Sequence, residues 1–177
     1  MFRPAPMSDA AREQAFIALV EQHAGILRKV AASYTRTHAD RHDLMQEISL
    51  HMWKAYPRYT PDRSFSTWMY RIALNVAISH LRRASRPLRQ TVPLEEECNL
   101  AAGPATENEP DERVALLERV TEELEPLNRA LLLLYLEERE YREIAAILGL
   151  TETNVATKLS RLKQRVRTEI ARLRKDT

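Results

Sequence analysis

The segment from Tyr141 to Leu162, YREIAAILGLTETNVATKLSRL, constrains the fold more than any other part of the chain. Its apolar residues recur at helical spacing, first over a short stretch and then, after Gly149, over a longer one. Gly149 suits a tight turn because it has no Cβ. Thr151 is a suitable N-cap for the helix that follows. The pattern therefore predicts two helices joined by a tight turn.

The second of these helices has two chemically different faces. Its apolar residues lie three or four positions apart and form one stripe: Val155, Leu159, Leu162, Val166, Ile170 and Leu173. Its other face carries hydrogen-bonding and cationic side chains: Asn154, Thr157, Lys158, Arg161 and Arg165. A brace helix followed by a helix with a polar, basic face is the arrangement of a helix-turn-helix that enters the DNA major groove. An ordinary helical hairpin with a solvated basic face is the alternative interpretation.

The composition narrows the class of protein. The chain has 177 residues but only 3 glycines, and alternating β-branched runs are few, which favours an all-α fold. No apolar run is long enough to span a membrane, and the first residues lack the apolar core of a signal peptide. The single cysteine, Cys98, excludes an internal disulfide and a multi-cysteine zinc site. We therefore expect a soluble, cytoplasmic protein.

Charge divides the chain into three blocks. Residues 1–91 hold 14 Lys and Arg against 7 Asp and Glu, a net charge of +7. Residues 92–125 hold 2 against 11, a net charge of −9, and residues 126–177 hold 11 against 7, a net charge of +4. Two basic blocks that flank an acidic one indicate a polyanionic partner.

The apolar periodicity predicts two small helical domains. Residues 1–85 form a four-helix unit with a first helix from Ser8, a break near Gly25, a third helix at 40–55 and a fourth helix that begins near residue 64 and ends near 83. Residues 86–110 contain five of the prolines and glycines and no sustained apolar period, so they form a linker. Residues 111–177 form the second domain, with helices from Asp111 and Pro126 before the helix-turn-helix.

Aromatic and cationic residues alternate where the first domain's loop meets its fourth helix. The sixteen residues from Tyr56 to Arg71 hold five aromatics and three arginines. Rings can stack on unpaired bases and arginines bind phosphates, so this stretch suits a protein that handles single-stranded DNA. The alternative is that the rings, above all Phe65 and Trp68, belong to the core. Tyr56 and Tyr59 are the better candidates for exposure.

Two further clusters in the first domain carry charge. Asp43, Gln46 and Glu47 share one helix face, which suits a protein partner unless the face is merely solvated. Arginines at the end of the fourth helix suit duplex phosphates: Arg82, Arg83, Arg86 and Arg89. His38 and His42 lack further apparent metal ligands, and no catalytic constellation is visible. We therefore expect no metal, no cofactor and no enzymatic activity.

Two sets of residues in two domains resemble one protein family. Asp43-Leu44, Gln46-Glu47 and Trp53, followed by Phe65, Trp68-Met69, Ile72-Ala73, Asn75 and Arg82-Arg83, resemble region 2 of bacterial RNA polymerase sigma factors. Residues 126–167 resemble their region 4. The short length and the absence of a distinct middle domain resemble the extracytoplasmic-function (ECF) group of the sigma-70 family.

The resemblance implies a role for each cluster. Asp43, Gln46 and Glu47 would dock on the β′ clamp helices of core RNA polymerase, and the helices that precede the recognition helix would hold the β flap. The acidic linker would thread the polymerase cleft. The residues that would contact and melt the −10 element are Tyr59, Ser64, Phe65, Trp68, Arg71, Asn75, Arg82 and Arg83. The residues that would contact the −35 element are Asn154, Ala156, Thr157, Lys158, Ser160, Arg161 and Arg165.

The resemblance also implies regulation by an anti-sigma factor. The alternative function is a stand-alone helix-turn-helix transcriptional regulator. Such a regulator would leave the pattern from Asp43 to Arg83 unexplained, and it would usually need a dimer for two half-sites.

Overall fold

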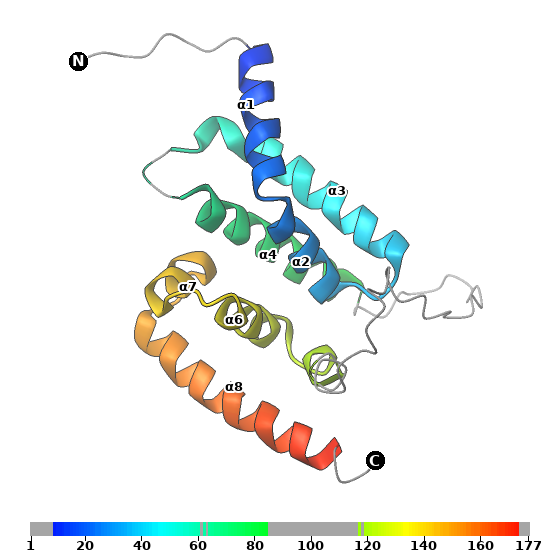
Figure 1. The fold of residues 1–177 in the computed structure, drawn as a ribbon, viewed down its shortest axis with the longest axis vertical. Helices are drawn as coiled ribbons and strands as arrows, with labels where there is room; N and C mark the ends of the chain where they lie inside the picture. The colour runs from blue at the N-terminus through cyan, green and yellow to red at the C-terminus, as the bar shows by residue number, and fades with distance from the viewer. Residues whose placement is uncertain (1–8, 61, 63, 85–116, 118, 174–177) are drawn as a thin grey trace.

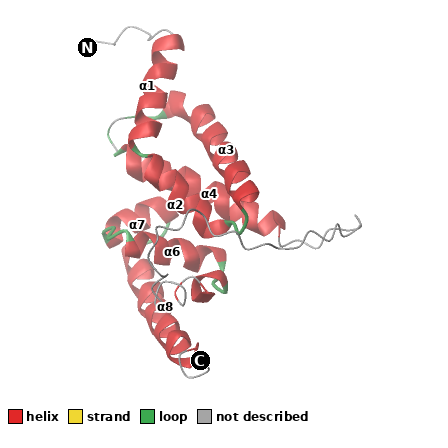
Figure 2. Ribbon diagram, turned by 45° about the vertical axis from the view of Figure 1, so that its right-hand side comes forward, coloured by secondary structure: helices red, strands yellow, loops and turns green. Residues whose placement is uncertain are grey.

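The computed structural model describes residues 9–60, 62, 64–84, 117 and 119–173 (Figure 1). Every regular element within these ranges is helical, as Figure 2 shows. The prediction of an all-α fold is therefore confirmed. The acidic linker, Cys98, Arg86 and Arg89, and the start of the helix expected from Asp111 lie outside the described residues.

The first domain consists of α1 (Asp9–Gln22), α2 (Ala24–Tyr34), α3 (His38–Ala55), the 3-10 turn η1 (Tyr56–Arg58) and α4 (Phe65–Ala84). Helices α2, α3 and α4 pack against one another, and their fully buried side chains form the core: Val30, Leu44, Ile48, Met52, Met69, Tyr70 and Leu74. The break between α1 and α2 falls at His23, not at Gly25. Gly25 is helical, so its conformational freedom is not needed there.

Hydroxyl side chains set where the next two helices begin. The Oγ1 of Thr37 accepts a hydrogen bond from the backbone N–H of Asp40 at 3.0 Å, so α3 begins two residues earlier than expected. The Oγ of Ser64 accepts one from the N–H of Thr67 at 3.3 Å, which starts α4 at Phe65. In both cases the hydroxyl satisfies a donor that the first turn leaves unpaired.

The second domain contains α6 (Pro126–Leu136), α7 (Tyr141–Leu148) and α8 (Glu152–Leu173), preceded by helical residues 117 and 119–122. The predicted tight turn is present: Gly149 adopts φ 68°, and the N–H of Leu150 donates to the carbonyl of Ala145 at 3.0 Å. The N–H of Asn154 donates to Thr151 Oγ1 at 3.2 Å, which confirms the predicted N-cap. Ile144, Val155 and Leu159 are fully buried where the helices meet.

The two domains pack against each other. Helices α6 and α7 lie against α4 and α2, while α8 lies on the far side of α6 and α7 from the first domain (Figure 1). Buried apolar residues of both domains belong to one core, and polar groups add to the contact. The Oη of Tyr34 donates to the carbonyl of Pro126 at 2.8 Å, and Arg129 donates to the carbonyl of Ser33 at 3.0 Å. No local pattern in the sequence predicts this packing.

Candidate nucleic-acid interface

Helix α8 presents its predicted polar face to solvent. Asn154, Thr157, Ser160, Arg161 and Arg165 are exposed, while Ala156 and Lys158 are half-buried. The apolar stripe on the opposite side packs on α6 and α7. Burial of this stripe fixes the rotation of the helix, so all seven predicted contact residues lie along the accessible side or its edge.

Not every group on this face is equally available. The hydroxyl of Thr157 donates to the carbonyl of Thr153 at 2.9 Å, one turn earlier in the helix. Arg161 lies one turn after Thr157 on the same side of α8 and is exposed. A guanidinium on an exposed helix face can donate two parallel hydrogen bonds to a guanine or bind a phosphate. Arg161, like the exposed Arg165, is therefore chemically suited to bind a base or a phosphate.

The aromatic residues of the first domain form a packed cluster rather than an exposed platform. Phe65 is 6% exposed, and its ring lies 5.1 Å from that of Trp68, 5.2 Å from that of His23 and 5.5 Å from that of Tyr59. Tyr59 and Trp68 are half-buried. The ring of Tyr56, expected to be exposed, is also half-buried and stacks on Tyr59 at 6.1 Å. The core interpretation therefore holds for Phe65, and it holds in part for the other three rings.

Polar members of the expected −10 set remain accessible around this cluster. Ser64, Arg71, Asn75 and Arg82 are exposed on α4 or at its start. Arg83 is exposed as well, but its guanidinium donates to Glu47 at 2.5 Å. The exposed donors therefore follow α4 along its length, while the rings lie at its N-terminal end.

Glu47 faces α4, whereas its two predicted companions face solvent. Its carboxylate accepts hydrogen bonds from Arg83 and contacts His80 Nδ1 at 3.3 Å, and it is 27% exposed. The hydrogen bond from Arg83 is the main reason that the pKa of Glu47 is lowered. Asp43 and Gln46 are exposed. Glu47 and Arg83, expected to meet different partners, thus neutralise each other.

Sequence reasoning missed two apolar members of the Asp43 face. Leu50 is 50% exposed and Trp53 is 37% exposed. They follow Asp43 by seven and ten positions, so they lie on the same side of α3 as Gln46. Their positions relative to Asp43 could have revealed this face. Two carboxylate or amide groups and two large apolar groups together form a surface suited to a protein partner.

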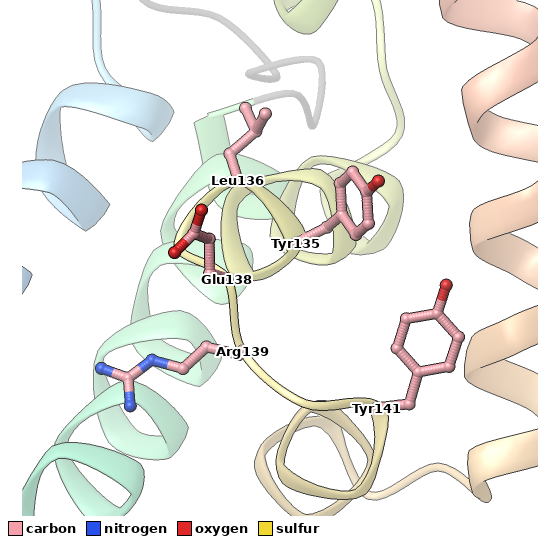
Figure 3. Close-up of a pocket in the computed structure, with 5 residues that line it drawn as sticks. All are labelled: Tyr135, Leu136, Glu138, Arg139 and Tyr141. Carbon is pink, nitrogen blue, oxygen red and sulfur yellow. The ribbon is translucent and has the colours of Figure 1, made fainter.

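A second surface with exposed apolar groups lies between α6 and α7 (Figure 3). Here a shallow hollow of about 420 Å³ is lined by Tyr135, Leu136, Glu138, Arg139 and Tyr141. Tyr135 and Tyr141 lie on the side nearer α8, while Arg139 extends toward α4. Leu136, the last residue of α6, is 53% exposed. The hollow is open, so it suits a protein segment better than a small molecule.

The described residues hold neither a membrane-spanning helix nor a cluster of metal-binding side chains. None of the described helices combines the length and apolar character needed to cross a membrane. Among the same residues, no three His, Cys, Asp or Glu side chains gather in a way that could hold a metal ion.

Two known sequence families match the two domains. Residues 19–87 match sigma-70 region 2, and residues 114–166 match sigma-70 region 4. The chain belongs to the sigma-70 family of RNA polymerase sigma factors. The curated relatives include proteins named as ECF sigma factors, which places this family member in the extracytoplasmic-function group.

Individual relatives are distant but extend over most of the chain. The ECF RNA polymerase sigma factor SigE of Mycolicibacterium smegmatis is 29% identical over 90% of this chain and 63% of its own length. The probable sigma factor RfaY of Xanthomonas campestris is 29% identical over 93% of this chain and 42% of its own length. The chain thus spans less than two thirds of either relative. CnrH of Cupriavidus metallidurans is 28% identical over 96% of this chain and 88% of its own length.

Two solved structures share the fold. CnrH in complex with the cytosolic domain of CnrY superposes with a TM-score of 0.61 at 25% identity, over 93% of this chain and 90% of that one. The sigma factor RpoE of Bartonella quintana, in complex with the anti-sigma factor NepR, gives a TM-score of 0.66 at 20% identity. It covers 90% of this chain and 96% of its own, and at that identity it supports the fold alone.

Proposed function

We propose that this chain is a sigma factor that binds core RNA polymerase and directs initiation at promoters with −10 and −35 elements. The observation that carries the proposal is the order of regions 2 and 4 on two helical domains, with the polar, basic face of α8 open to solvent. The protein supplies recognition, and the polymerase supplies the catalysis. It acts in the cytoplasm, where the polymerase and the chromosome are.

Region 4 reads the −35 element through α8. Its N-terminal half enters the major groove, where Arg161 and its neighbours Asn154 and Thr157 reach base edges. Lys158 and Arg165 contact phosphates, and Ala156 and Ser160 complete the surface against the DNA. A single reader of this size binds DNA weakly by itself, so the polymerase provides the remaining affinity by tethering it beside the promoter.

Region 2 opens the −10 element along α4. Ser64, Arg71, Asn75 and Arg82 supply donors on the exposed side of the helix, and the half-buried edges of Tyr59 and Trp68 meet unstacked bases. Phe65 acts indirectly. Its buried ring packs against Tyr59 and Trp68 and holds them in place. Arg83 contacts DNA only when its guanidinium leaves the carboxylate of Glu47 or binds Glu47 and the DNA at the same time.

Protein partners bind elsewhere on the molecule. Asp43 and Gln46, together with Leu50 and Trp53, dock on the β′ clamp helices, and Glu47 orients this helix from its inner side. The hollow between α6 and α7 accommodates the β flap. The CnrH and RpoE structures contain the cytosolic domain of CnrY and the anti-sigma factor NepR, respectively, and we propose that a comparable anti-sigma factor regulates this protein.

Transcription with purified core RNA polymerase tests the proposal. The chain is expected to bind core and to direct runoff transcripts from a promoter that core alone does not use. Asp43→Lys is expected to weaken core binding about tenfold, equivalent to about 1.4 kcal/mol, by reversing a charge on the docking face.

Glu21→Lys provides the matched control, since it makes the same charge change on an exposed part of α1. Equal core affinity for both variants would remove the α3 face from the proposal. Failure of the wild-type chain to bind core would refute the sigma-factor function and favour a stand-alone DNA-binding regulator.

A further inference from the structure

One buried ring outside the matched family region joins two of the proposed surfaces. The match to sigma-70 region 2 begins at residue 19, and Phe16 precedes it on α1. We propose that Phe16 is a positioning residue for opening of the −10 element, because its ring fixes the arrangement of Tyr59 and Trp68. This inference rests on the proposed function, in which these two rings meet unstacked bases.

Phe16 is the main anchor of α1 on the rest of the first domain. It is 8% exposed, and it is the only buried residue of this helix. Leu19 and Val20, about one turn further on, are partly buried against the core. Most other residues of α1 are exposed, and Ile17, which follows Phe16 directly, is 46% exposed. Burial of Phe16 therefore determines where α1 contacts the domain.

The ring of Phe16 lies between one ring of α3 and one of η1. Its centre is 5.2 Å from that of Trp53, on the proposed docking face, and 5.1 Å from that of Tyr56. The interplanar angles are 58° and 55°, and such tilted pairs are favourable between aromatic rings. Among the described rings, Phe16 is the only one that pairs with Trp53. Phe16 thus links the α3 face to η1.

Tyr56 extends the contact to the rings proposed to meet bases. Its ring stacks on that of Tyr59 at 6.1 Å and makes a T-shaped contact with Trp68 at 6.4 Å. The rings of Tyr59 and Trp68 are themselves 5.2 Å apart. Five rings therefore form one packed series: Trp53, Phe16, Tyr56, Tyr59 and Trp68.

The two tyrosines of this series depend on packing for their placement. Tyr56 lies in a single 3-10 turn, and Tyr59 follows the turn with extended backbone, its N–H donating to the carbonyl of Tyr56 at 2.9 Å. Short 3-10 segments have poorer hydrogen-bond geometry than α-helices. A side chain that receives a ligand therefore needs neighbours that lock its rotamer. Phe16 is such a neighbour for Tyr56, and Tyr56 is one for Tyr59 and Trp68.

A purely structural role for Phe16 is the alternative. In that role the side chain fills space, so another apolar side chain of similar size serves nearly as well, and its loss affects stability alone. In the positioning role the ring itself is needed, and its loss also reaches Trp68, with which Phe16 has no ring contact. Phe16→Leu separates the two roles, because it keeps apolar bulk and removes the ring.

Fluorine NMR reports the ring positions without any partner. The chain has 2 tryptophans, so 5-fluorotryptophan labels Trp53 and Trp68, and Trp53→Phe assigns the two resonances. Phe16→Leu is expected to shift both, that of Trp53 through the lost contact and that of Trp68 through Tyr56. Ile17→Ala, on the exposed side of the same helix, should leave the Trp68 resonance unchanged. An unchanged Trp68 resonance in Phe16→Leu would overturn the proposal.

Binding to single-stranded DNA tests the effect on function. The probe is a single-stranded oligonucleotide with the non-template −10 sequence of a promoter that the wild type uses with core polymerase. In the core complex, Phe16→Leu is expected to bind it about tenfold more weakly, because Tyr59 and Trp68 lose their arrangement. Phe16→Tyr retains the ring and should stay within about twofold of the wild type. Wild-type affinity in Phe16→Leu, or equal weakness in both variants, would contradict a positioning role for the ring.

A stability control excludes a general loosening of the first domain. Val30→Ala shortens a fully buried side chain of α2 that is not part of the ring series. This variant is expected to unfold at a lower temperature and to keep its affinity for the oligonucleotide. Affinities are compared at a temperature at which circular dichroism shows every variant to be folded. An equal loss of affinity in Val30→Ala and Phe16→Leu would assign the effect to stability and refute positioning.

The outcomes distinguish this inference from the proposed function. If the wild type binds core and the oligonucleotide, and Phe16→Leu does so equally well, the sigma-factor function stands and the positioning role is refuted. If the wild type binds core and its complex does not bind the oligonucleotide, opening of the −10 element by region 2 is refuted, and the inference goes with it. Core affinity should change less than oligonucleotide affinity in Phe16→Leu, since Trp53 is one of four side chains on the docking face.

Discussion

The two surfaces proposed to meet the promoter are built in different ways. On α8 of region 4, the expected DNA contacts are exposed or at the edge of the exposed face, and none lies in the core. In region 2 the expected contacts are divided. Ser64, Arg71 and Asn75 are exposed, whereas Phe65 is part of the core and Arg83 is paired with Glu47. The residues predicted from the sequence to contact DNA are thus uniformly accessible in region 4, whereas in region 2 they are divided between the surface and the core.

The reason lies in how each surface is formed. Helix α8 packs with one stripe only, so its 3.6-residue period decides which side chains meet solvent. The region 2 surface involves a loop, a 3-10 turn and the first turns of α4, which pack ring on ring. Large rings there contribute to the core and to the surface at the same time. Periodicity along one helix carries no information about such a cluster.

The largest expected effect tests whether the region 2 surface, unlike that of region 4, depends on a core residue. Phe65→Ala is expected to lower the free energy of unfolding by about 3–5 kcal/mol, because it removes a buried ring that contacts three others. Urea denaturation followed by circular dichroism measures the loss. Trp53→Ala, at a 37% exposed ring, serves as the comparison and should cost less. A Phe65→Ala variant with wild-type stability would show that the ring is not a core residue.

An intermediate effect is expected for Arg161 on the exposed face of region 4. Arg161→Ala is expected to leave stability within about 0.5 kcal/mol of wild type, since the side chain is exposed. It should weaken promoter use by about 1–3 kcal/mol and relax the base preference at one position of the −35 element. In vitro transcription from a set of −35 variants measures both. Arg167→Ala removes the same charge from another side of α8 and should keep the base preference; matching profiles for the two variants would contradict base reading by Arg161.

The smallest effect concerns the Glu47–Arg83 pair in region 2. The pKa of Glu47 is lowered in the folded protein from an ordinary value of 4.5, so ionised Glu47 stabilises the fold above that pH. This contribution is lost as the pH falls through the lowered pKa. Glu47→Gln should therefore cost at most about 1 kcal/mol at neutral pH, since the pair is solvent-screened. The difference from wild type should shrink below about pH 4, as measured by thermal unfolding. A difference that persists to pH 3 would exclude the ion pair as its source.

The sequence alone determined the features that are local along the chain. Helical periodicity, Gly149 and Thr151 predicted the turn and the cap of the helix-turn-helix, because each depends on backbone and side-chain groups a few residues apart. The order of the two family regions likewise follows from residues read one after another, and the recognition of the sigma-70 family is confirmed. The proline-rich, acidic stretch predicted as a linker stays a prediction.

Only the tertiary structure decided which groups meet across elements. Phe65 is buried because the rings of His23 before α2, Tyr59 after η1 and Trp68 on α4 converge on it. Glu47 faces inward because α4 brings Arg83 within reach. The contact between Arg129 and Ser33 joins residues 96 positions apart, and nothing in their local sequences indicates it. Such contacts form only when distant helices pack, so the packing of regions 2 and 4 against each other could not be derived from the pattern of residues along the chain.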